Sequence, residues 1–184
     1  EETLKTLNDL ITSGKVRYIG CSNFSAWQLV ESRWKVDILG LENFISAQNG
    51  YSVINRKIEN DLSQLAIKYS IGILPYFPLE SGLLTGKYKN PITFDIGDHR
   101  SAVKEFKNKD IINKLRRNKK QLEKRFSYHE NPVMYGIINA LFDDSPTGCV
   151  LLGQRNIRQV HVASTLGNVL PKKDSDWVKS LYKI

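Results

Sequence analysis

Hydrophobic and polar positions recur along the chain with two different periods. Leu4, Leu7 and Leu10 follow helical spacing and the segment ends at Ser13 and Gly14, which predicts a helix closed by a turn. Residues 16–21 form a short β-branched and aromatic run, which predicts a strand. The same alternation predicts further strands at 44–48, 71–78 and 148–153 and helices at 27–36, 58–66, 107–126, 133–142, 157–166 and 176–182.

Several polar residues stand where helices are expected to begin. Ser25 and Ser175 carry hydroxyls that can accept a hydrogen bond from a first-turn N–H, so each is predicted to cap the helix that follows it. Asn55 and Glu59 favour a helix start near residue 58.

The order of these elements predicts the fold class. Strands that alternate with helices, and are apolar enough to be buried on both faces, favour a parallel α/β sheet. Two architectures fit that description, the doubly wound sheet and the (β/α)8 TIM barrel. The doubly wound sheet needs a G-x-G-x-x-G turn after a strand, and the sequence contains none. We therefore expect a barrel, whose chemistry gathers at the carboxyl ends of its strands.

Composition narrows the class of protein. The 184 residues are 41% hydrophobic and 25% charged, which allows a buried core and excludes general disorder. No run approaches the ~18 apolar residues of a membrane span, so no membrane partner is expected. Cys21 and Cys149 are expected to be packing thiols in a reducing, cytoplasmic compartment. The only methionine is Met134 and the chain opens with Glu1, so we expect a fragment of a longer protein.

The net charge of +8 lies mostly in one segment. Between Lys107 and Arg125 there are nine basic residues against Asp110 and Glu123, on a helix whose apolar positions form one stripe. Aromatic interleaving and a nucleic-acid reading motif are both absent from this sequence, so we interpret the segment as a solvated helix face and expect no nucleic-acid partner. No cluster of His, Cys, Asp and Glu has metal-ligand spacing, so no metal is expected.

Polar and aromatic residues recur at the expected carboxyl ends of the strands. Ser22, Asn23 and Gln48 offer donors and acceptors suited to a carboxamide, and Tyr76 offers a ring face to a planar heterocycle. Taken singly, each has an ordinary structural alternative: the Ser-Asn pair as a helix cap, Gln48 as a satisfied buried amide and Tyr76 as a core residue. Segment 81–87 combines small residues, hydroxyls and a lysine, which suits a loop laid over a diphosphate.

Four stretches together resemble the aldo-keto reductases. Residues 14–25, 48–52, 55–59 and 74–88 recur at that family's spacing, and the resemblance covers almost the whole chain, weakening between about Pro91 and Ser145. It implies that residues 1–184 form the C-terminal half of the barrel, roughly strands five to eight, with a long cofactor loop at about 81–107 and a basic helix at about 107–126. It also implies reduction of a small-molecule aldehyde or ketone by hydride transfer from NADPH.

The resemblance assigns NADP(H) contacts residue by residue. The nicotinamide carboxamide would be held by Ser22, Asn23 and Gln48, and its ring would stack on Tyr76. The ribose and pyrophosphate would lie along Phe77, Pro78, Leu79, Ser81, Gly82, Thr85 and Lys87. The adenosine end would contact Gly153, Arg155 and Gln159. The family often has a Glu and an Asn shortly after this Gln, but His161, Val162 and Ala163 stand here instead.

The family's catalytic Tyr, Asp, Lys and His belong to strands one to four, so no catalytic residue is assigned in this chain, which alone is expected to be inactive. The alternative is a truncated remnant or a non-enzymatic interaction module of the same fold. In either case, exposed half-barrel edges favour self-association.

Overall fold

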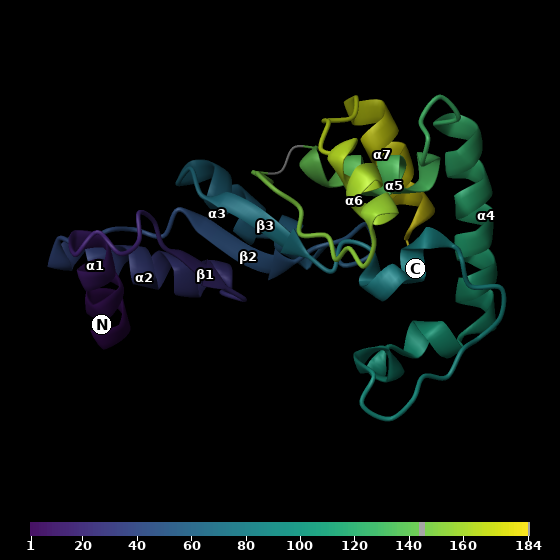
Figure 1. The fold of residues 1–184 in the computed structure, drawn as a ribbon. Helices are drawn as coiled ribbons and strands as arrows, with labels where there is room; N and C mark the ends of the chain where they lie inside the picture. Colours follow the sequence, from purple (N-terminus) through teal and green to yellow (C-terminus); the bar gives the residue numbers. More distant parts are fainter. Residues whose placement is uncertain (144–145, 184) are drawn as a thin grey trace.

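The computed structural model describes residues 1–143 and 146–183; residues 144, 145 and 184, which fall within the expected 1–184 domain, lie outside the described residues. One end of the molecule holds α1 (Glu2–Thr12), β1 (Gly20–Ser22), α2 (Ala26–Leu39), β2 (Ser46–Gly50), α3 (Leu62–Lys68) and β3 (Gly72–Tyr76). The other end holds α4 (Lys109–Arg125), α5 (Pro132–Asn139), α6 (Ile157–Ser164) and α7 (Lys172–Leu181). Figure 1 shows the strands pointing their carboxyl ends toward this second group of helices.

The strands form a parallel sheet in the order β1-β2-β3. Its register places Ser22 opposite Gln48, and Gln48 opposite Leu74. Burial alternates along the strands: Ala47 and Ile73 are fully buried, whereas Gln48 and Leu74 are half-buried. The α/β class with a parallel sheet is confirmed. The expectation of burial on both faces is wrong, because one face stays partly open.

The strand expected at 148–153 does not form as a regular strand. Thr147 makes an isolated bridge to Ile73, Gly148 N donates to Ile73 O at 3.2 Å, and Leu151 N donates to Pro75 O at 2.9 Å. Proline has no N–H, so Pro75 cannot donate the next bond of this ladder. The segment therefore follows β3 without continuous pairing.

Other boundaries differ from the sequence expectations for identifiable reasons. Helix α3 begins at Leu62 and is capped by Asp61, while residues near 58 form a separate 3-10 turn, η1 (Lys57–Glu59). Ser175 lies inside α7, where it is buried and donates to Ala140 O, so it is not a cap. Cys149 is exposed, not a packing thiol.

The expected loop at 81–107 also contains local structure. It includes the 3-10 turns η2 (Glu80–Thr85), η3 (His99–Ala102) and η4 (Lys104–Lys107). The predicted Ser25 cap of α2 and the basic helix α4 are confirmed.

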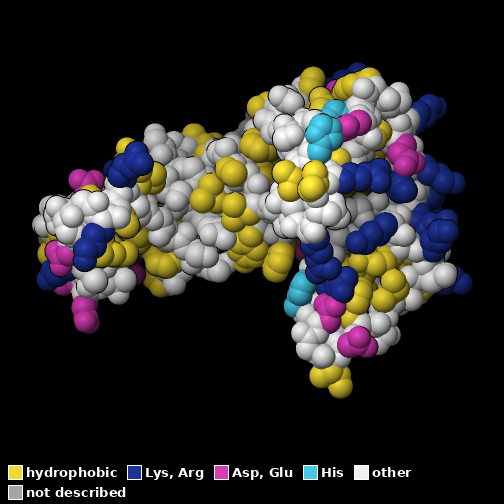
Figure 2. Space-filling model, viewed as in Figure 1, with side chains coloured by type: hydrophobic (Ala, Val, Ile, Leu, Met, Phe, Trp, Pro, Cys, Tyr) yellow, Lys and Arg dark blue, Asp and Glu magenta, His cyan; other side chains and the backbone are white. Residues whose placement is uncertain are grey.

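Helix α4 separates a buried stripe from a charged face. Ile112, Leu115 and Leu122 are buried against the other helices. A Cβ at Gly136 of α5 would lie 2.7 Å from Leu122 Cδ2, so glycine is what lets these two helices approach. Figure 2 shows Lys and Arg side chains gathered along the edge of the molecule where α4 runs.

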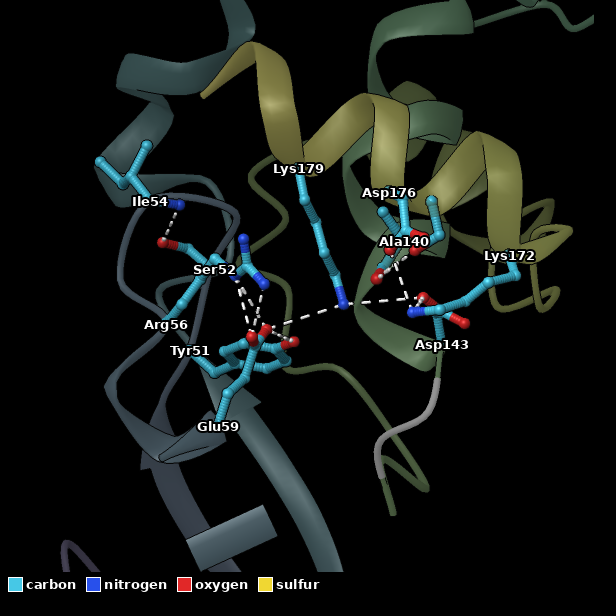
Figure 3. A network of polar contacts seen from close by, with 11 residues as sticks. Tyr51, Ser52, Ile54, Arg56, Glu59, Ala140, Asp143, Lys172, Asp176 and Lys179 are labelled. Carbon is cyan, nitrogen blue, oxygen red and sulfur yellow. Dashed lines mark hydrogen bonds and ion pairs between the residues drawn. The ribbon is translucent and has the colours of Figure 1, made fainter. Parts of the chain in front are cut away.

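A buried ionic network ties α7 to the segment after β2 (Figure 3). Lys179 Nζ lies 3.6 Å from Glu59 Oε1 and 3.8 Å from Asp143 Oδ2, and the Lys179 and Asp143 side chains are only 7% and 5% exposed. Tyr51 OH donates to Glu59 Oε1 at 2.7 Å, and Arg56 Nη2 donates to Glu59 Oε2 at 2.6 Å. Tyr51 follows directly on β2, so the network fixes the chain just beyond Gln48.

Burial acts to raise the pKa of Glu59, but hydrogen bonds from Arg56 and Tyr51 and the charge of Lys179 outweigh it and hold that pKa below its usual value. The folded-state pKa is thus depressed. Glu59 therefore stabilises the fold fully above its unfolded pKa of about 4.3, and that stability is lost as pH falls through the folded value.

We predict that Glu59→Gln lowers the free energy of unfolding by about 2 kcal/mol at pH 7, because it leaves charged partners unmatched. The difference from the unsubstituted chain should shrink below about pH 4 as Glu59 becomes protonated. Urea unfolding at several pH values measures both effects. The matched control is Glu123→Gln, which breaks an exposed pair with Lys119 and should cost less than about 1 kcal/mol. Equal losses in the two variants would contradict the account.

Candidate functional site

The carboxyl ends of β1, β2 and β3 bring Ser22, Asn23, Gln48 and Tyr76 together. Ser22 Oγ donates to Gln48 O at 3.3 Å, and Asn23 Nδ2 donates to Ser22 Oγ at 3.2 Å. Tyr76 OH donates to Asn23 Oδ1 at 2.6 Å, joining the first strand to the third. The side chains of Ser22, Asn23 and Tyr76 are therefore joined to one another, and Ser22 also bonds the backbone of Gln48.

Gln48 differs from Ser22, Asn23 and Tyr76 because its side chain makes no hydrogen bond to any described residue. This carboxamide is half-buried on the open face of the sheet. A primary carboxamide both donates and accepts, so it can pair with another carboxamide. Gln48 is thus available to a ligand in a way that Asn23, bonded to Tyr76, is not.

The turn after β3 is held in a left-handed backbone conformation. Phe77, Glu80, Ser81 and Gly82 have φ values of 54°, 46°, 56° and 86°. For a residue other than glycine this conformation costs about 1–2 kcal/mol, and such strain persists only where surrounding contacts impose it. Ser52 Oγ supplies one such contact by donating to Glu80 Oε1 at 2.6 Å. Burial raises the pKa of Glu80, while this hydrogen bond acts to lower it.

Lys87 brings positive charge to this turn. A Cβ at Gly82 would lie 3.2 Å from Lys87 Nζ, so the ammonium occupies the space that glycine leaves open. Thr85 Oγ1 donates to Gly82 O at 2.8 Å and closes the turn. Pro78 is buried and Leu79 half-buried beneath it. The turn thus places a glycine, the Ser81 hydroxyl and the Lys87 ammonium together, and this set suits a diphosphate.

His99 reaches the same turn from the 81–107 segment. Its Nε2 lies 2.9 Å from Ser81 Oγ, and its ring stacks on that of Phe77 with centroids 6.0 Å apart and an interplanar angle of 7°. Sequence reasoning missed this residue, because neither contact follows from a local pattern.

Gly153, Arg155 and Gln159 gather at the beginning of α6. Asn156 caps this helix by accepting from Gln159 N at 3.0 Å, and Gln159 Oε1 accepts from Arg155 N at 2.6 Å. Space around the Cα of Gly153 is open. Among the described residues, no hydrogen bond or ion pair joins this group to the turn at 77–87, so the structure forms two separate polar clusters.

No group of three or more His, Cys, Asp and Glu side chains in the described part of the chain is arranged to hold a metal ion. Across residues 1–143 and 146–183, no helix has both the length and the apolar character to cross a membrane.

Comparisons with known proteins agree with one another. The model of the aldo/keto reductase family matches residues 1–178. The aldo-keto reductase dtxS3 of Metarhizium robertsii is 42% identical over 84 residues, which are 46% of this chain and 23% of that protein. Versiconal hemiacetal acetate reductase of Aspergillus parasiticus is 33% identical over 84 residues, 46% of this chain and 24% of that protein.

A solved structure extends the similarity to the fold. The glycerol dehydrogenase AKR11B4 from Gluconobacter oxydans matches with a TM-score of 0.76 and 28% sequence identity, covering 95% of this chain and 51% of that one. The chain therefore spans about half the length of this structural relative, and its matches to the two reductases span about a quarter of theirs.

Proposed function

The chain belongs to the aldo/keto reductase family, and we propose that it forms the cofactor-binding half of an NADP-dependent reductase of aldehydes or ketones. The family and its structural relative imply a (β/α)8 barrel, to which this chain would contribute strands five to eight. The proposal rests on the Gln48 carboxamide, which has no hydrogen-bond partner among the described residues. It lies beside Ser22, Asn23 and Tyr76, which are hydrogen-bonded to one another.

At the nicotinamide end, Ser22, Gln48 and Tyr76 would orient the nicotinamide ring of the cofactor. Bound NADPH supplies the hydride that reduces a carbonyl carbon to an alcohol carbon. Gln48 and Ser22 would bind the nicotinamide carboxamide and so fix which face of the ring is presented. Tyr76 would pack on the ring, and its bond to Asn23 holds it in place beforehand. Such preorganisation lowers the ordering cost of binding.

At the diphosphate end, Lys87 and the strained turn supply the fitting chemistry. The Lys87 ammonium beside Gly82 would neutralise phosphate charge, and the Ser81 hydroxyl can donate to a phosphate oxygen. Thr85, whose hydroxyl donates to Gly82 O, would keep the turn closed beside the phosphates. Phe77, Pro78 and Leu79 would line the path toward the ribose.

The cluster at α6 fits the adenosine end. The first turn of the eight-residue helix α6 presents N–H groups, and the exposed Arg155 adds a permanent positive charge, which together favour a 2′-phosphate. The chain contributes binding, and the general acid of carbonyl reduction would come from elsewhere in the full barrel. An inactive remnant or a non-enzymatic module remains the alternative, and absence of cofactor binding would favour it.

We predict that Lys87→Met weakens NADPH binding about tenfold, because a charge-assisted contact is lost. Gln48→Ala should weaken it by a similar factor. The dissociation constant, followed by NADPH fluorescence, measures both. Lys120→Met removes an equal charge from α4 and is the matched control, with unchanged affinity expected. Unchanged affinity in both site variants, or an equal loss in the control, would contradict the site.

A second prediction concerns cofactor choice. Arg155→Leu should reduce the ratio of NADPH to NADH affinity about tenfold, since only NADPH carries the 2′-phosphate. Competitive titration of the two cofactors measures this ratio. An unchanged ratio would refute the assignment of Arg155 to the 2′-phosphate.

We also propose that the chain self-associates through its open sheet. β1 is an edge strand, and Figure 2 shows hydrophobic side chains over the middle of the molecule, where the sheet lies. Leu74→Lys, on the open face, is predicted to shift sedimentation equilibrium toward monomer. Ile96→Lys, at a fully exposed loop position, is the control and should leave the equilibrium unchanged. A monomeric unsubstituted chain at all concentrations would refute this proposal.

A further inference from the structure

A continuous line of side-chain contacts leads from the sheet edge to the turn at 77–82. Tyr76, bonded to Asn23, meets Phe77 edge-on with ring centroids 5.2 Å apart. Phe77 stacks on His99, and His99 Nε2 lies 2.9 Å from Ser81 Oγ. His99 is therefore the link that joins the two ends of the turn, although it lies 18 residues beyond Ser81.

The strain of the turn explains why such a link is needed. Three of its residues other than glycine, Phe77, Glu80 and Ser81, have positive φ. Glu80 is held by the buried Ser52. Phe77 is exposed and Ser81 half-buried, and His99 contacts both of their side chains. Without His99, Phe77 and Ser81 each lose a contact that holds their backbone at positive φ.

The segment that carries His99 is itself fixed. Asp98 Oδ1 accepts from Arg100 N at 2.9 Å and caps η3, and the Arg100 guanidinium holds the pKa of Asp98 well below its usual value. Arg100 also packs over the Phe94 ring, with Cζ 4.1 Å from its centroid. His99 Nδ1 lies 3.9 Å from Asp98 Oδ1. The imidazole is thus presented to the turn by a short, locally bonded element.

We propose that His99 is a positioning residue that holds the 77–82 turn in the shape that receives a diphosphate. Its ring fixes Phe77. With Nε2–H donating to Ser81 Oγ, the O–H of Ser81 is left to donate to the ligand. The inference rests on the proposed function, because it takes this turn as the diphosphate site. His99 acts through Phe77 and Ser81, so its effect should reach any diphosphate ligand and not only the nicotinamide.

The experiment compares NADPH with inorganic pyrophosphate, which carries the diphosphate alone. His99→Ala is expected to weaken both ligands about tenfold, since one hydrogen bond and one ring contact are lost. His99→Gln, which can still bond Ser81, should recover part of that loss. Gln48→Ala should weaken NADPH and leave pyrophosphate unchanged. Lys104→Ala, an exposed neighbour in η4, is the matched control. The His99 side chain is 64% exposed, so thermal unfolding should shift little.

A double variant separates positioning from a general structural effect. In a Ser81→Ala background, His99→Ala should cost clearly less than tenfold, because the hydrogen bond is already gone and only the ring contact with Phe77 is left to lose. A full tenfold loss in that background, or unchanged affinity for both ligands in His99→Ala, would overturn the proposal. Failure of the proposed function looks different, because the unsubstituted chain would then bind neither ligand, which would overturn both.

Discussion

The parallel register of β1, β2 and β3 is the constraint on which the candidate site depends. Parallel strands end at the same edge of a sheet, so residues distant in sequence meet there. The register sets Ser22 beside Gln48, and the bond between Tyr76 and Asn23 then closes the group across three strands. A shift of one residue in β2 would turn Gln48 toward the buried face and remove its carboxamide from the site.

The segments that follow β2 and β3 are held in place by contacts that lie outside the sheet. The network centred on Glu59 anchors the chain after β2 to α7, and Ser52 anchors Glu80 at the start of η2. These buried polar groups do not promote burial by themselves, since desolvating charge is costly. What they provide is a fixed position for the polar turns after β2 and β3, whose apolar neighbours Tyr51 and Leu83 are buried in the core.

Most helices and strands, and the polar residues at the strand ends, could be predicted from the sequence because they follow from local patterns. The helix and strand periods, the Ser25 cap and the polar residues at strand ends depend on neighbouring residues. The predictions that were wrong, and the residue that was missed, depend on tertiary contacts or on the neighbouring strand. Pro75 interrupts pairing with the segment after Thr147, and Ser175 is used inside α7 to bond Ala140 O. His99 reaches Phe77 and Ser81 only because the 81–107 segment folds back, which no local pattern encodes.

If the sheet edge and the turn after β3 hold a nicotinamide dinucleotide, a crystal structure of the chain grown with NADPH should show it there. We expect the nicotinamide carboxamide within hydrogen-bond distance of Gln48, its ring on Tyr76 and the diphosphate at the turn beside Lys87. NADPH bound at another surface, with Gln48 free and the turn at 77–87 empty, would contradict it.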